Sequence, residues 1–233
     1  CNPCANRLMA AVGGGSPEAG AQKVTATMRQ LGLENFYLCA PFRIVGLWQD
    51  EGRIVQTAAT EAFGAAGLWA MQAQTPRYDR CVRATPREMA TLVEMIYDGT
   101  QGQGLLVETY PDLTEQTFQE MIDIMAANDL RNMLGAGIPN EVKLAHKHGF
   151  SGYDVPWGDT RGEVGIVYSP GATWLISFYI WEDTPWIDWG INQPLYRDVS
   201  NMLYNYFNPE DPYWPLPPWA PPPVEEAAED TEA

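Results

Sequence analysis

The sequence predicts an α+β fold, in which an antiparallel sheet is flanked by helices. Before Pro139, apolar residues recur at the helical spacing of three to four positions. After Pro139 the period changes to two, which is typical of strands, and it returns to helical spacing near Leu195. Helices, then a run of strands, then a closing helix indicate an α+β domain.

The composition excludes several classes of protein. The chain has 233 residues, enough for one domain with a real core, and its formal net charge is −16 with only 14 Lys and Arg. Nucleic acid is therefore not an expected partner, because binding to the phosphate backbone needs a basic face. No apolar run approaches the roughly 18 residues of a membrane span. No cofactor motif stands out.

Two helices are expected at the start of the chain. The first runs over residues 2–11 into Gly13. Ser16 and Pro17 then supply an N-cap and a proline at the first helical position, and Gly32 ends the second helix. A long, weakly patterned insertion follows at about 34–80, with a short helix expected at residues 57–63.

Two further helices follow this insertion. Thr85 and Glu88 have the spacing of a capping box, with Pro86 between them, and Gly99 ends the helix that they begin. The next helix begins near Thr114 and carries an apolar stripe. Its methionines are expected to fill the core.

Three strands are expected after Pro139, at residues 142–147, 164–169 and 173–181. The turn at residues 169–172 is short enough to make the last two an antiparallel hairpin. The first strand is expected to end at Lys147-His148-Gly149. A helix with Leu195, Val199, Leu203 and Phe207 on one side closes the domain, which we place at residues 1–208.

Residues 209–233 differ in composition from the rest. Eight prolines lie between Pro209 and Pro223, together with Tyr213, Trp214 and Trp219, and acidic residues follow. This proline- and tryptophan-rich tail, acidic at its end, is expected to be extended or disordered. Two alternatives remain open: it docks in a groove of a protein partner as polyproline II, or it packs on its own domain.

Four cysteines bear on the cellular compartment. Cys39 and Cys81 bracket the insertion, and we expect them to form a disulfide, which implies an extracytoplasmic (periplasmic or secreted) protein. Cys1 and Cys4 have the spacing of a redox or metal pair, but no second pair accompanies them, so no metal site is expected. The start at Cys1, without an initiator Met, suggests a longer precursor or processing.

A candidate site lies at the end of the first strand. An edge strand that ends in Lys147 places an ammonium beside free backbone groups, where it can attract a carboxylate while the strand pairs with an extended substrate. Gly149 allows that substrate to approach the backbone closely.

The residues around this site resemble a known family. The runs 142–149 (Val-Lys-Leu-Ala-His-Lys-His-Gly) and 162–171 (Gly-Glu-Val-Gly-Ile-Val-Tyr-Ser-Pro-Gly) are similar to the Lys-Thr-Gly strand and the following strand of class A β-lactamases, which are penicillin-recognising serine hydrolases. Residues 85–90 look like a helix start of that family, and residues 2–6 look like the tail of its Ser-x-Asn motif.

The resemblance implies site residues and a fold. Asn2 would hold the substrate amide, and Lys147, His148 and Gly149 would form the carboxylate-binding strand, with His148 in place of the family's Thr. The Ser-x-x-Lys motif that supplies the family's nucleophile is absent from this chain. The implied fold is β-lactamase/transpeptidase-like with its N-terminal part missing. The deacylating glutamate is not identifiable, and Glu51 and Glu61 are only candidates.

Two functions follow from the resemblance. The first is a β-lactamase-like serine hydrolase domain, acting by acyl transfer on a β-lactam or D-alanyl peptide and inactive as this chain alone, so that a companion polypeptide segment or chain would complete the sheet and supply the serine. The alternative is a pseudoenzyme, a structural or docking subunit of a larger extracytoplasmic assembly. A secreted redox or metal module built on Cys1-x-x-Cys4 is a more distant third. Separately, Cys1 or Cys4 could act as a nucleophile only if a histidine folded within hydrogen-bond reach of the thiol.

Overall fold

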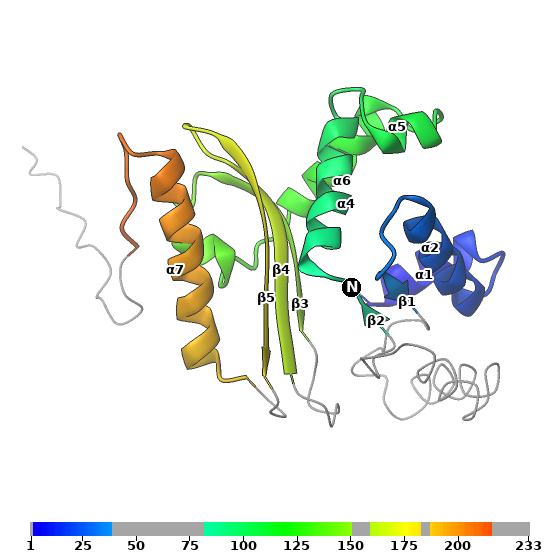
Figure 1. Cartoon of the computed structure of the whole chain (residues 1–233), viewed down its shortest axis with the longest axis horizontal. Coiled ribbons are helices and arrows are strands. Elements are labelled where there is room, and N and C mark those ends of the chain that lie inside the picture. The colour runs from blue at the N-terminus through cyan, green and yellow to red at the C-terminus, as the bar shows by residue number, and fades with distance from the viewer. Residues whose placement is uncertain (1, 39–81, 151–158, 183–186, 216–233) are drawn as a thin grey trace, which may run out of the picture. The chain divides into compact units, whose positions relative to one another are not determined.

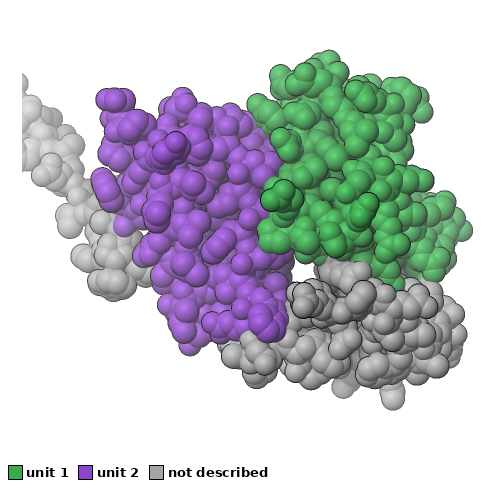
Figure 2. Space-filling model, viewed as in Figure 1, with its two compact units in different colours: residues 1–122 green, residues 123–233 purple. Residues whose placement is uncertain are grey.

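The computed structural model describes residues 2–38, 82–150, 159–182 and 187–215. These residues form two compact units, a first unit of Cys1–Ile122 and a second unit of Asp123–Ala233 (Figure 2). Among the described residues, no helix is both long and apolar enough to cross a membrane. The expected helix at residues 57–63, the candidates Glu51 and Glu61, and the pair Cys39 and Cys81 all lie outside the described ranges.

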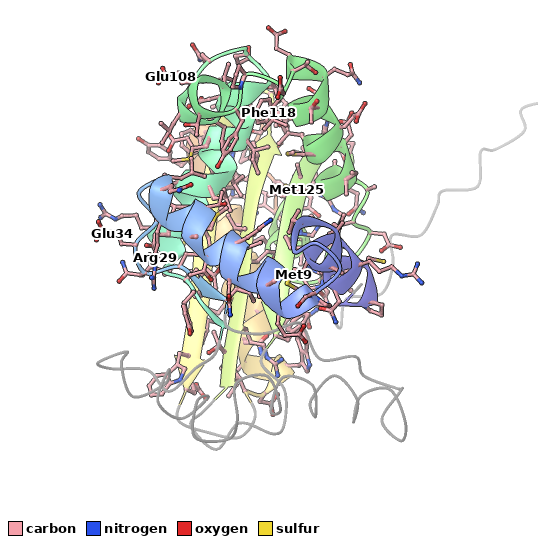
Figure 3. The ribbon with its side chains drawn as sticks, turned by 90° about the vertical axis from the view of Figure 1, so that its right-hand side faces the viewer. Met9, Arg29, Glu34, Glu108, Phe118 and Met125 are labelled. Carbon is pink, nitrogen blue, oxygen red and sulfur yellow. The ribbon has the colours of Figure 1, made fainter. Side chains whose placement is uncertain are left out.

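The first unit begins with a close pair of helices, α1 (Asn2–Val12) and α2 (Pro17–Gln30). Ser16 caps α2 as the sequence predicts, since its hydroxyl accepts a hydrogen bond from the Ala19 N–H at 3.1 Å. The helices approach so closely at Gly20 that a Cβ there would lie 1.9 Å from the Met9 carbonyl oxygen. Met9, labelled in Figure 3, and Ala21 are both buried in one small apolar cluster at these helices.

The capping box predicted at Thr85 is present at the start of α4 (Pro86–Gly99). Glu88 also accepts a hydrogen bond from the Asn35 N–H at 2.6 Å, which attaches the segment after α2 to this helix. These contacts hold the pKa of Glu88 below its ordinary value although its burial acts in the opposite direction. Two helices follow, α5 (Leu105–Thr109), which the sequence did not predict, and α6 (Glu115–Ala126).

A second core cluster lies at α4, α5 and α6. Phe118 (labelled in Figure 3) is fully buried there. Leu31 and Leu106 belong to the same cluster. Gly99 leaves room for the Phe118 ring, because a Cβ at Gly99 would lie 2.4 Å from it. Two short strands absent from the prediction, β1 (Tyr37–Leu38) and β2 (Val82–Arg83), pair antiparallel and bring together the two ends of the insertion.

The second unit is built on a three-stranded antiparallel sheet in the order β3-β4-β5 (Figure 1). The strands are β3 (Lys143–Phe150), β4 (Asp159–Tyr168) and β5 (Thr173–Glu182), and the last two form the predicted hairpin. Two expected boundaries were wrong. Strand β3 does not end at Lys147-His148-Gly149 but continues to Phe150, and β4 begins five residues before Val164, because the two strands pair along their whole lengths.

Helix α7 (Trp189–Phe207) covers one face of this sheet (Figure 1). It begins before the predicted Leu195, at an N-cap formed by Asp188, whose carboxylate accepts from the Gly190 N–H at 2.6 Å. Its inner face and the sheet share one core, which contains Leu144, Val167, Trp174, Ile176, Tyr196 and Tyr204.

A 3-10 helix, η1 (Leu134–Gly137), packs against α7. Ser200 on α7 is fully buried and donates to the Leu134 carbonyl at 2.7 Å. The described start of the tail also lies on α7, where Asn205 binds both the backbone N–H and the carbonyl of Tyr213, at 2.8 and 3.1 Å. Of the two alternatives for the tail, these contacts support packing on its own domain for residues 209–215. The remainder of the tail lies outside the described ranges.

Candidate functional site

Strand β3 places the predicted site residues on two different faces of the sheet. Side chains alternate along a strand, so Lys147 points to one face and His148 to the other. Lys147 is exposed, and its Nζ donates to the His148 carbonyl oxygen at 2.7 Å. A ligand lying along β3 would therefore meet the ammonium on one face and the imidazole on the other.

The surroundings of Gly149 are open. It is exposed, and a Cβ built at this position would have no neighbour within 4 Å. Gly162, which pairs with Gly149 across the sheet, has crowded surroundings, because a Cβ there would lie 2.2 Å from the Tyr179 ring. A side chain at position 162 would thus force the Tyr179 ring to move, whereas one at position 149 would meet nothing. Since β3 is an edge strand among the described strands, an extended ligand can reach the backbone at Gly149.

His148 is half-buried and contacts both aromatic and polar groups. Its ring centroid lies 4.9 Å from that of Phe150, and its Nδ1 lies 3.4 Å from Asn128 Nδ2. Burial lowers the pKa of His148, and the charge of Lys147 acts in the same direction, whereas Glu163 opposes both. The imidazole is therefore neutral at pH 7.

The electrostatic state of Lys147 follows from the same groups. Desolvation by surrounding protein atoms lowers its pKa, and the negative charge of Glu163 raises it. The lowering prevails, so the surroundings of Lys147 disfavour its charged form relative to a lysine in water. An ammonium at this position can attract an anionic ligand at the strand edge.

A buried acid–base pair lies beside these residues and was not predicted from the sequence. His146 and Glu163 are 0% and 1% exposed, and His146 Nδ1 contacts Glu163 Oε1 in a short hydrogen bond. The other oxygen, Glu163 Oε2, accepts from the Leu134 N–H at 2.9 Å. The alternation of side chains along β3 could have indicated that His146 is buried, because it puts His146 on the same face as the buried Leu144.

An aromatic enclosure extends this polar group along the same face of the sheet. Arg161 is 1% exposed, and its guanidinium carbon lies 5.3 Å from the ring centroids of both Phe150 and Trp189. Tyr196 donates its hydroxyl hydrogen to the Arg161 carbonyl at 2.8 Å, and burial raises the pKa of this phenol. The buried cation is thus held between β3, β4 and α7.

The other predicted site residues are not brought to this strand by described contacts. Asn2 begins α1 in the first unit, and its side chain lies outside the described part of the structure. Its role as the amide-binding residue stays a prediction. Cys4 is disulfide-bonded, whereas the Cys39–Cys81 pairing stays a prediction. Within the described ranges, no cluster of three His, Cys, Asp or Glu side chains could hold a metal ion.

The comparison with protein families decides the ancestry of the chain. A model described as the beta-lactamase enzyme family matches residues 2–207. The chain belongs to this family. The match covers both compact units, so the helices before Ile122 and the sheet after Asp123 derive from one scaffold. A comparison with curated proteins finds no relative.

Solved structures agree with this β-lactamase-like fold. PBP-A matches with a TM-score of 0.51 and 22% identity, over 82% of this chain and 52% of its own. A class A β-lactamase from Bacteroides cellulosilyticus matches with a TM-score of 0.51 and 15% identity, over 82% and 55%. An ancestral class A β-lactamase matches with a TM-score of 0.52 and 20% identity, over 88% and 60%. The chain thus spans about half the length of the first two.

Proposed function

We propose that this chain supplies the strand-edge half of a β-lactamase-like acyl-transfer site, which binds the carboxylate of a β-lactam or D-alanyl peptide. The observation that supports this most is that β3 carries both a lysine and an open backbone position close together. Lys147 presents an ammonium at an edge strand, and Gly149, two residues later, leaves open space beside the backbone. An extended acyl substrate can pair with such an edge while its carboxylate meets the ammonium.

We further propose that the nucleophile comes from a companion polypeptide segment or chain. No serine of this chain is followed by lysine three positions later, so the chain alone does not form an acyl-enzyme. Strands β3 and β5 both lie at edges of the described sheet, and strand addition at either would complete it. An extracytoplasmic location accords with this family and with the disulfide at Cys4.

Replacing Lys147 is the direct test of the proposed ligand contact. We expect benzylpenicillin to bind the chain reversibly, and Lys147→Met to weaken this binding about 10- to 100-fold, the loss expected for a hydrogen bond to a charged group. Ligand-induced shifts in an amide NMR titration measure both affinities. The same substitution should raise the pKa of His148, because the charge of Lys147 lowers it.

Lys143→Met is the matched control, because Lys143 lies on the same strand and pairs instead with Asp123 at 2.9 Å. It should leave penicillin binding unchanged. Intact-mass measurement should show no covalent adduct on the chain alone. Equal affinities for wild type and Lys147→Met would rule out the proposed role of Lys147, and an adduct would rule out the need for a companion.

Gly149→Ala is expected to separate binding from folding. The added methyl group meets no protein atom, so the free energy of unfolding should change by less than about 0.5 kcal/mol. The same methyl group projects from the face of β3 that carries Lys147, beside the ligand-binding edge, and should weaken benzylpenicillin binding about tenfold through steric exclusion. Urea unfolding and the NMR titration measure the two effects. Unchanged affinity would show that the ligand does not approach Gly149.

The alternative is a pseudoenzyme that serves as a docking subunit. One observation favours it: α7 carries exposed apolar side chains along its outer side, at Ile191, Leu195, Met202 and Tyr206. Exposed apolar residues that share one side of a helix are typical of protein contacts. The titration described above also separates the two functions, because a docking subunit would show no saturable, Lys147-dependent response to benzylpenicillin.

A further inference from the structure

The contacts of the buried His146 ring determine which of its nitrogens donates to the Asn128 backbone. His146 Nε2 faces the Asn128 carbonyl oxygen at 3.3 Å. A carbonyl oxygen only accepts hydrogen bonds, so Nε2 must carry the proton and donate it. On the other side of the ring, His146 Nδ1 and Glu163 Oε1 form a hydrogen bond. This arrangement fixes the backbone of Asn128 against the sheet.

The side chain of Asn128 is oriented by a second contact. Its Oδ1 accepts from the Leu130 N–H at 3.2 Å, which places the amide nitrogen Nδ2 on the other side. That nitrogen lies 3.4 Å from His148 Nδ1. Because Nδ2 carries only donors, His148 Nδ1 must accept, and the proton of the neutral ring must be on Nε2.

We propose that Glu163, His146 and Asn128 form a positioning relay that fixes His148 in its Nε2-protonated tautomer, making it a neutral hydrogen-bond donor for a carboxylate ligand at β3. The relay runs from a carboxylate buried on β4, through the loop that precedes η1, to the half-buried ring on β3. None of the three relay residues needs to touch the ligand.

The relay gives the histidine a defined chemical role. A neutral imidazole can donate from one nitrogen only, so an unconstrained ring would present a donor or an acceptor according to its tautomer. With Nδ1 occupied by Asn128, Nε2 always donates. Lys147 and His148 would then supply a charged and a neutral donor from opposite faces of one strand. The use of this donor by a carboxylate rests on the proposed function, whereas the tautomer does not.

Asn128→Asp tests the relay with almost no change in side-chain shape. The carboxylate keeps an oxygen for the Leu130 N–H and places a second acceptor opposite His148 Nδ1, so the ring should now donate from Nδ1. The two tautomers give different patterns in long-range nitrogen–proton NMR spectra of the imidazole. The chain contains only two histidines, and His148→Ala assigns the remaining ring to His146.

The expected result at neutral pH is an Nε2-protonated His148 in the wild type and mainly Nδ1 protonation in Asn128→Asp, with the His146 signals unchanged. Asn128→Ala, which removes the partner, should give a mixture of tautomers and about threefold to tenfold weaker benzylpenicillin binding, as for one lost hydrogen bond. The same His148 tautomer in all three proteins would overturn the relay. The expected tautomers without any penicillin response would support the relay and contradict the proposed function.

Discussion

Glu163→Ala is expected to destabilise the second unit by about 3–5 kcal/mol, because it leaves two buried hydrogen-bonding groups without a partner, each at a cost of about 1–3 kcal/mol. Glu163 is 1% exposed and makes two contacts through its carboxylate, with the His146 ring and with the Leu134 N–H. Its loss leaves the ring and the N–H buried without an acceptor. It also releases the loop before η1 from the sheet.

Urea unfolding, followed by the fluorescence of the tryptophans in this unit, measures the loss. The matched control is Asp123→Ala, which removes the exposed ion pair with Lys143 and should cost less than about 1 kcal/mol. The double substitution of His146 and Glu163 by leucine should recover much of the stability, because two well-packed apolar side chains can replace a buried pair. A Glu163→Ala protein as stable as Asp123→Ala would contradict the proposed importance of the pair.

The second large effect is expected at Gly137, where η1 packs on α7. A Cβ at Gly137 would lie 2.1 Å from both the Arg197 carbonyl oxygen and Ser200 Oγ. These atoms belong to the helix backbone and to a fully buried side chain, so neither can move aside cheaply. Gly137→Ala should therefore cost about 3 kcal/mol, at the upper end of what overpacking usually costs.

The measurement for Gly137 is again urea unfolding, and hydrogen exchange locates the damage. Amide protons of α7 near Ser200 should exchange faster in Gly137→Ala than in the wild type. Gly149→Ala is the control in the same unit, because the same methyl group there meets nothing. Comparable stability of the two variants would show that the approach of η1 to α7 is looser than the structure describes.

Much of the fold was predictable because the signals are local. The capping residues Ser16 and Thr85 were identified correctly, since a cap needs only one side chain and the next turn of backbone. The change of period after Pro139 located the sheet for the same reason. Boundaries were less accurate. Strand β4 begins at Asp159 rather than Val164 because pairing with β3 and β5, and not its own apolar pattern, sets its length.

The site was only partly predictable. Lys147 and Gly149 were singled out because their spacing on a strand is visible in the sequence, and their role stays a prediction. The family match confirms the ancestry that the surrounding runs suggested. Asn128 was missed. It lies in an irregular loop, and only the folded chain places its amide beside a histidine 20 residues later. Glu163 was noticed only as part of a family-like strand, without its partner.

By itself, the sequence determined the fold class, the family and the strand that carries the lysine. Periodicity and capping act over a few neighbouring residues, and the order of the family-like runs can be read directly along the chain. Only the tertiary structure decided that Lys147 and His148 point to opposite faces with His148 held by Asn128, and that a buried carboxylate lies behind them. Hydrogen bonds between distant segments depend on register and packing, which are fixed only when the strands and the loop before η1 come together.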